Sequence, residues 1–134
     1  NNLKNLLILP FQSVDMLPYS LTAPDISIVL DSFSSDKNDS TASIPSKLFY
    51  IMAAGTVVYA EADKKSELNR IINKYDIGLC DETKSIEKLK SFILACKTNK
   101  NYFVKMKKNS RKASFNFSKK NANLIFNEIE KFKI

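Results

Sequence analysis

The sequence contains no histidine and no tryptophan, and only two cysteines and two glycines among its 134 residues. The absence of histidine removes the commonest general base, any Ser-His or Cys-His nucleophile pair, and most zinc sites. We therefore expect no metal site and identify no catalytic residue. If the chain is part of an enzyme, its acid or base is a carboxylate or lies elsewhere.

The two cysteines, Cys80 and Cys96, fit no metal-binding or redox spacing. Both lie among apolar residues, which favours buried small side chains in a reducing cytoplasm. Long apolar runs are also absent, and none approaches the ~18 residues that a membrane span needs. These features predict a cytoplasmic protein.

The length is sufficient for one domain with a single core, so we interpret residues 1–134 as a single unit. The chain begins Asn1-Asn2-Leu3 without methionine and passes at once into an apolar run. This start suggests a fragment of a longer protein.

Short apolar runs alternate along the chain with amphipathic segments. The first run, Leu6–Leu9, ends at Pro10 and resembles a buried strand. Further strands are expected at 25–30, 56–60 and 77–80, and helices at 16–22, 46–54, 66–75, 85–97, 101–112 and 119–131. A serine-rich loop is expected over 31–43. Strands that alternate with helices predict an α/β fold with a parallel sheet and a helical C-terminal tail.

Ligands of parallel α/β sheets bind at the carboxyl ends of the strands. Three segments are therefore candidate sites. They are Phe11 and Gln12 after the first expected strand, the serine-rich loop after the second, and Glu61 and Asp63 after the third.

The helix that follows Pro45 has a first turn suited to an anion. A helix N-terminus exposes unpaired N–H groups and the positive end of the helix dipole. Ser46, which we expect to cap this helix, adds a hydroxyl, and Lys47 adds a positive charge. Gly55 is expected just beyond its C-terminus. The arrangement suits a diphosphate, but it also fits an ordinary capped helix whose Lys47 points into solvent.

Several motifs occur in an order that resembles a known family. They are Leu9-Pro10-Phe11-Gln12, Leu17-Pro18-Tyr19-Ser20-Leu21, Ala23-Pro24-Asp25-Ile26-Ser27, Pro45-Ser46-Lys47-Leu48-Phe49, Met52-Ala53-Ala54-Gly55, Ser66-Glu67-Leu68, Ile77-Gly78-Leu79 and Phe115-Asn116-Phe117-Ser118. Together they resemble the C-terminal domain of the retaining glycosyltransferase family 4. The branch is the one seen in capsule, O-antigen and colanic-acid synthesis, and the resemblance extends from about Leu6 to Phe132.

The resemblance implies a GT-B enzyme, in which two Rossmann-like domains enclose the active site. This chain would be part of the C-terminal domain, which holds a nucleoside-diphosphate sugar, and the acceptor-binding N-terminal domain would precede residue 1. The full-length protein would then be a hexosyltransferase-like enzyme, and the fragment alone would be inactive. No cofactor is implied apart from the donor substrate.

The family also implies roles for individual residues. The backbone around Ser43, Ile44 and Ser46 would hold the diphosphate with Lys47 close by, and Tyr50 would face the ribose, with Phe11 and Gln12 beside the base. Many members have two glutamates eight positions apart, the second of which binds the ribose. Ala42 and Tyr50 occupy those positions here, so neither carboxylate is present.

The charge of the chain is concentrated at its C-terminal end. Residues 1–96 carry 10 Lys/Arg and 12 Asp/Glu, a net charge of −2, whereas residues 97–134 carry 11 and 2, a net charge of +9. The net positive charge therefore belongs to the C-terminal segment, which we interpret as a basic helical tail over 98–134. Residues 97–120 could bind nucleic acid through phosphates and stacked bases, could lie against an anionic membrane surface, or could be a solvated lysine-rich helix face. The implied lipid-linked acceptor favours a position peripheral to the inner membrane.

Two hypotheses follow for the whole chain. The first is the donor-binding domain of a glycosyltransferase in cell-surface polysaccharide synthesis. The alternative is a non-catalytic α/β module that binds nucleic acid through its basic tail.

Overall fold

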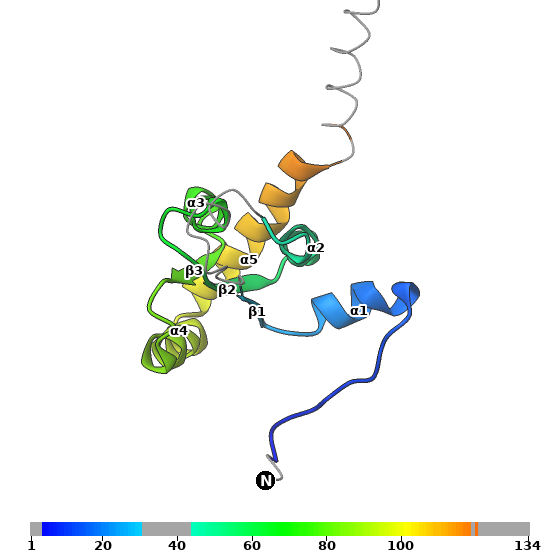
Figure 1. Ribbon diagram of the computed structural model, residues 1–134, viewed down its shortest axis with the longest axis horizontal. Helices are drawn as coiled ribbons and strands as arrows, with labels where there is room; N and C mark the ends of the chain where they lie inside the picture. Colours follow the sequence, from blue (N-terminus) through cyan, green and yellow to red (C-terminus); the bar gives the residue numbers. More distant parts are fainter. Residues whose placement is uncertain (1–3, 31–43, 119, 121–134) are drawn as a thin grey trace, which may run out of the picture.

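The computed structural model describes residues 4–30, 44–118 and 120 (Figure 1). The expected loop over 31–43, with Ser43 and Ala42 in it, lies outside the described residues, as does all but Lys120 of the expected helix over 119–131. Between these gaps the elements are η1 (Val14–Met16), α1 (Leu17–Thr22), β1 (Ile26–Leu30), α2 (Lys47–Ala54), β2 (Val57–Glu61), α3 (Glu67–Tyr75), β3 (Gly78–Asp81), α4 (Ile86–Thr98), α5 (Lys100–Ser114) and η2 (Phe115–Phe117).

The three strands form a parallel sheet in the order β1-β2-β3. Neighbouring parallel strands need a crossover connection, and α2 and α3 provide these two connections. The predicted parallel α/β fold with a helical C-terminal part is therefore confirmed, and its arrangement is Rossmann-like.

The central strand β2 is buried on both faces, and four of its residues, Val57 to Ala60, have no exposed surface. Val58 and Ala60 pack into a core with α2 and α3, whereas Val57 and Tyr59 pack into a second core with α4 and the first half of α5. Figure 1 shows α2 and α3 on one side of the strands and α4 on the other. The domain thus has helices on both sides of its sheet.

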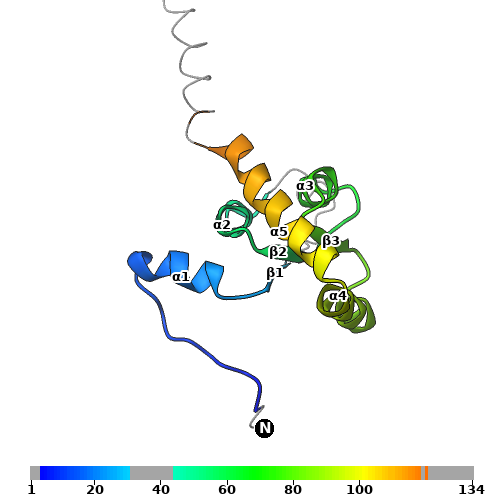
Figure 2. The same cartoon turned by 180° about the vertical axis from the view of Figure 1, so that it is seen from behind.

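Helix α5 crosses beside the amino ends of β2 and β3, in front of the strands in Figure 2. Arg111 donates a hydrogen bond to the Ala53 carbonyl at the end of α2. At the end of α3, the Asp76 carboxylate forms an ion pair with the Lys105 ammonium at 2.7 Å. The Asp76 carbonyl accepts a hydrogen bond from the Asn109 amide at 3.1 Å. Basic and amide side chains of α5 therefore bind the carbonyl-rich ends of two helices, where positive charge is favourable.

Most of the expected helix and strand boundaries are confirmed within one or two residues. Ser66 and Ser85 cap α3 and α4 by accepting bonds from the N–H groups of the third residue after each, which fixes where these helices begin. Gly55 ends α2 with a positive φ of 71°, as the sequence predicted. The Cys96 side chain is buried and that of Cys80 is half-buried.

The prediction of a buried strand over Leu6–Leu9 is wrong. These four side chains are 58 to 81% exposed, and the segment has an irregular backbone. A strand is stable only beside a partner that satisfies its backbone groups, and no described strand lies beside this segment. The same reasoning from apolar composition was correct for the runs that form β1, β2 and β3, because each of those has a neighbouring strand.

Gly78 is a position where the fold allows no side chain. A Cβ atom added there would lie 1.8 Å from the carbonyl oxygen of Val58, its register partner on β2. The two strands can keep this spacing only if residue 78 is glycine.

We predict that Gly78→Ala lowers the free energy of unfolding by about 3 kcal/mol or more, because the backbone of β2 must move. Gly55→Ala is the matched control, since its new Cβ has ordinary contacts and only the positive φ opposes it. That control should cost about 1 kcal/mol. Urea denaturation of both variants measures the difference, and equal losses would contradict this account of Gly78.

Candidate functional site

Helix α2 presents two opposite faces. Leu48, Ile51 and Met52 are buried against the sheet. Ser46, Lys47 and Tyr50 are exposed, and Tyr50 has 56% of its surface accessible. Residues three and four apart lie on one side of a helix, so the hydroxyl, the ammonium and the phenol share the outward face. The structure therefore brings together three of the residues that the sequence singled out.

The first turn of α2 is not capped as the sequence predicted. Ser46 occupies the cap position but has helical torsions (φ −55°, ψ −31°), and its side chain makes no cap hydrogen bond. A serine caps well when its own backbone is extended, as Ser66 is. The Leu48 and Phe49 N–H groups instead donate to the carbonyls of Pro45 and Ser46, at 2.9 and 3.1 Å. Among the described residues, neither the Ser46 hydroxyl nor the Lys47 ammonium has a partner.

An apolar groove runs along the same helix, between α1 and α2. It has a volume of about 330 Å³, and its lining residues are Val14, Leu17, Pro18, Leu21, Thr22, Tyr50, Ala53 and Ala54. The Thr56 hydroxyl donates to the Leu21 carbonyl at 2.9 Å, which fixes α1 beside the start of β2. The groove thus continues from Tyr50 toward the C-terminus of α2.

The remaining residues of the predicted site lie apart from this face. Ile44 is half-buried and packs against the core of α2 and α3. Phe11 is 98% exposed, and the amide of Gln12 donates to the nearby Pro10 carbonyl at 2.8 Å. Neither Phe11 nor Gln12 lines the groove. Their predicted place beside a base stays a prediction, and so does the role given to Ser43.

The third candidate segment, after β2, has a local structural role. Asp63 is exposed, and its carboxylate accepts from the Lys65 N–H at 2.7 Å, which forms the turn into α3. Glu61 is half-buried at the end of the strand.

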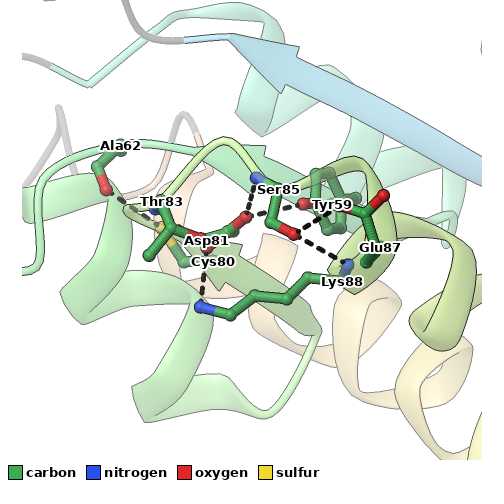
Figure 3. Close-up of polar contacts among 8 residues, drawn as sticks. All are labelled: Tyr59, Ala62, Cys80, Asp81, Thr83, Ser85, Glu87 and Lys88. Atoms are coloured by element: carbon green, nitrogen blue, oxygen red, sulfur yellow. Dashed lines mark hydrogen bonds and ion pairs between the residues drawn. The ribbon is translucent and has the colours of Figure 1, made fainter.

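A buried carboxylate that the sequence reasoning did not single out lies at the end of β3. Asp81 is 1% exposed and accepts five hydrogen bonds (Figure 3). Its donors are the Thr83 N–H and hydroxyl at 2.9 and 2.7 Å, the Ser85 N–H at 2.8 Å, the Lys88 ammonium at 2.9 Å and the Tyr59 hydroxyl at 3.1 Å. The spacing Asp-x-Thr-x-Ser after a strand is the signal that could have indicated this turn.

The hydrogen-bond donors around Asp81 favour its ionised form. Burial alone would raise the pKa of Asp81, but hydrogen bonds from Thr83, Lys88 and Ser85 outweigh it and hold the pKa well below its ordinary value. Burial, followed by the hydrogen bond to Asp81, raises the pKa of Tyr59 to about 12. The carboxylate stays ionised and fully bonded, so it fastens the β3 to α4 turn and has no proton to exchange near neutral pH.

The basic tail uses several of its side chains within the fold. Lys105 and Arg111 bind the ends of α3 and α2. The aromatic side chains of Tyr102 and Phe103 are half-buried in the second core. Phe117 packs between Phe49 and Tyr75, with ring centroids 5.1 and 5.9 Å away.

Aromatic stacking platforms are therefore scarce in this segment. Phe115, 65% exposed, is its most exposed aromatic residue among those described, and the Arg111 guanidinium lies 5.4 Å from its ring centroid.

Among the residues that the structure describes, no helix has the length and apolar character that a bilayer crossing requires. Comparisons with known protein families, with curated proteins and with solved structures found no match for this chain.

We predict that Asp81→Asn lowers the free energy of unfolding by about 2 kcal/mol near neutral pH, because buried donors lose a charged acceptor. The folded-state pKa of Asp81 lies below the ordinary value, so this contribution is present above about pH 5 and is lost as the pH falls through the ordinary carboxyl range and below it. The difference between wild type and variant should therefore shrink on acidification.

Urea denaturation at about pH 7 and about pH 3 measures this change. Glu82→Gln, at the exposed neighbouring position, is the control and should have little effect at either pH. A deficit in Asp81→Asn that does not depend on pH would show that the charge of Asp81 is not what stabilises the turn.

Proposed function

We propose that this chain is the donor-binding part of a glycosyltransferase in cell-surface polysaccharide synthesis. The enzyme would transfer a sugar from a nucleoside-diphosphate sugar to a lipid-linked saccharide. The observation that carries the proposal is the outward face of α2. This face combines an uncapped first turn bearing a hydroxyl and an ammonium, an exposed tyrosine one turn later, and an adjoining apolar groove.

The position of this face in the sheet supports the proposal. Helix α2 returns the chain from β1 to the amino end of the parallel strand β2, so its N-terminus lies toward the carboxyl ends of the strands. This is the edge where Rossmann-like sheets bind nucleotides. The Leu48 and Phe49 N–H groups are occupied by the Pro45 and Ser46 carbonyls. The Ser46 hydroxyl, the Lys47 ammonium and the positive end of the helix dipole are therefore the groups that would hold a diphosphate.

The distances along α2 also fit a nucleotide. Ser46 and Tyr50 are four residues apart, which corresponds to a rise of about 6 Å along the axis. A diphosphate at Ser46 and Lys47 would then place the ribose near the Tyr50 hydroxyl, which can donate and accept hydrogen bonds. The apolar groove beyond Tyr50 would receive the base. Tyr50 would take the place of the ribose-binding glutamate that the resembled family carries.

The chain supplies binding groups in this proposal, and the chemistry depends on the full-length enzyme. The acceptor and any catalytic carboxylate would come from the N-terminal domain that faces this edge of the sheet. The part of the chain described here would orient the donor and hold its diphosphate as the leaving group.

We predict that the full-length protein binds uridine or guanosine diphosphate and that Lys47→Ala weakens binding about tenfold or more, the range for loss of a charged hydrogen bond. Tyr50→Phe keeps the ring and removes the hydroxyl proposed to contact the ribose. It should therefore weaken binding of the nucleoside diphosphate and leave binding of the free base unchanged. Isothermal titration calorimetry measures both effects.

Lys90→Ala is the matched control, because it removes an exposed lysine from α4 on the other side of the sheet. Its affinity for the nucleotide should equal that of the wild type. If the full-length protein binds neither nucleotide, the proposed function is wrong. If Lys47→Ala and Lys90→Ala weaken binding equally, the diphosphate does not lie on α2.

A further inference from the structure

Helices α4 and α5 form a strongly basic pair. Residues 86–114 contain one acidic residue, Glu87, and nine basic ones, which are Lys88, Lys90, Lys97, Lys100, Lys105, Lys107, Lys108, Arg111 and Lys112. Four of the nine have partners among the described residues, since Lys88 pairs with Asp81, Lys105 with Asp76, and Arg111 with the Ala53 carbonyl. The fourth is Lys107, whose ammonium lies 5.4 Å from the Phe103 ring centroid. The others leave a large excess of positive charge on the surface.

One flank of α4 alternates basic and apolar side chains. Ile86, Lys90, Ile93, Leu94 and Lys97 are spaced four, seven, eight and eleven residues from the first, so they share one side of the helix. The apolar members are accessible to solvent, since Ile86 is 57%, Ile93 45% and Leu94 59% exposed. The core-facing side of α4 is a separate one, formed by Leu89, Phe92 and Cys96.

The flank continues into a groove where α4, α5 and the start of β1 meet. The groove has a volume of about 430 Å³ and is lined by Asp25, Ile26, Ile93, Cys96, Lys97, Lys100 and Phe103. Four of these side chains are apolar or thiol-bearing, and the charged ones are two lysines and one carboxylate. A mostly apolar lining with a net positive charge is complementary to an anionic amphiphile.

We propose that this surface, formed by the α4 flank and the groove and called here the α4 surface, binds an anionic phospholipid membrane. The exposed Ile93 and Leu94 would enter the boundary between headgroups and acyl chains. Lys90, Lys97 and Lys100 would extend their ammonium groups to the lipid phosphates, as lysines do beside apolar surfaces. Each lysine near an anionic leaflet contributes favourably, and several together give stable attraction.

The α4 surface favours a membrane over nucleic acid. Nucleic-acid surfaces that bind single strands interleave basic residues with exposed aromatic rings. Here the exposed neighbours of the lysines are aliphatic, and the nearby Tyr102 and Phe103 rings are half-buried in the second core. Aliphatic side chains gain nothing from a phosphate backbone, but they do gain from burial in lipid.

The inference does not depend on the proposed nucleotide site, because the two surfaces lie on opposite faces of the sheet. Helix α2 packs into the core that Val58 and Ala60 enter, whereas Phe92 and Cys96 of α4 pack into the second core with Val57 and Tyr59. A membrane bound to the α4 surface would therefore leave the face of α2 accessible.

Co-sedimentation of the full-length protein with vesicles tests the proposal. We expect binding to vesicles of phosphatidylcholine and phosphatidylglycerol and none to phosphatidylcholine alone. The double variant Lys97→Glu/Lys100→Glu should weaken binding by at least about thirtyfold, from the loss of two lysines at the surface. Leu94→Ser leaves the charge unchanged and should also weaken binding, because its side chain enters the lipid.

The matched control is Lys108→Glu/Lys112→Glu, which makes the same change of charge on the outer face of α5. Circular dichroism and urea denaturation of each variant confirm that the fold is retained. A much smaller loss in this control supports the α4 surface as the membrane contact. The proposal is overturned if both double variants lose affinity equally, if Leu94→Ser binds like wild type, if the vesicles are not bound, or if a single-stranded oligonucleotide binds more tightly than the vesicles.

Discussion

The central strand β2 is the element on which the rest of the structure depends. Its side chains are buried on both faces, so helices must cover both sides of a sheet of only three described strands. Successive side chains of a strand point to opposite faces, and Val58 and Tyr59 accordingly enter different cores. The close approach of Gly78 to Val58 allows β3 to pair with this strand. Gly55, with its positive φ, ends α2 two residues before β2 begins.

This arrangement separates two edges of different chemistry. Parallel strands joined by helices place the helix N-termini at the carboxyl edge and the helix C-termini at the amino edge. The amino edge is covered by α5, whose Asn109 and Arg111 donate to carbonyls at the ends of α3 and α2. The carboxyl edge keeps the first turn of α2 exposed. The proposed anion site follows from this polarity of the sheet, whereas the proposed membrane contact lies on the face that α4 covers.

The sequence was sufficient for the elements whose signals are local. The alternation of β-branched runs and amphipathic segments predicted β1, β2, β3 and their helices, and Gly55 marked the end of α2. It failed where the outcome depends on distant partners. Leu6–Leu9 is as apolar as the segments that form strands, but no described strand lies beside it. Ser46 has helical backbone torsions, which the sequence pattern did not predict. The bonds of Asp81 to Tyr59 and Lys88 also required the fold, since they join β2, β3 and α4.

The central claim is that the exposed face of α2 holds the diphosphate of a nucleotide. Amide hydrogen exchange of the full-length protein, with and without uridine or guanosine diphosphate, tests it most directly because it locates the ligand. The account predicts slower exchange in residues 44–50 and no change in α4. Protection confined to α4 or α5, or no protection in the presence of bound nucleotide, would contradict it.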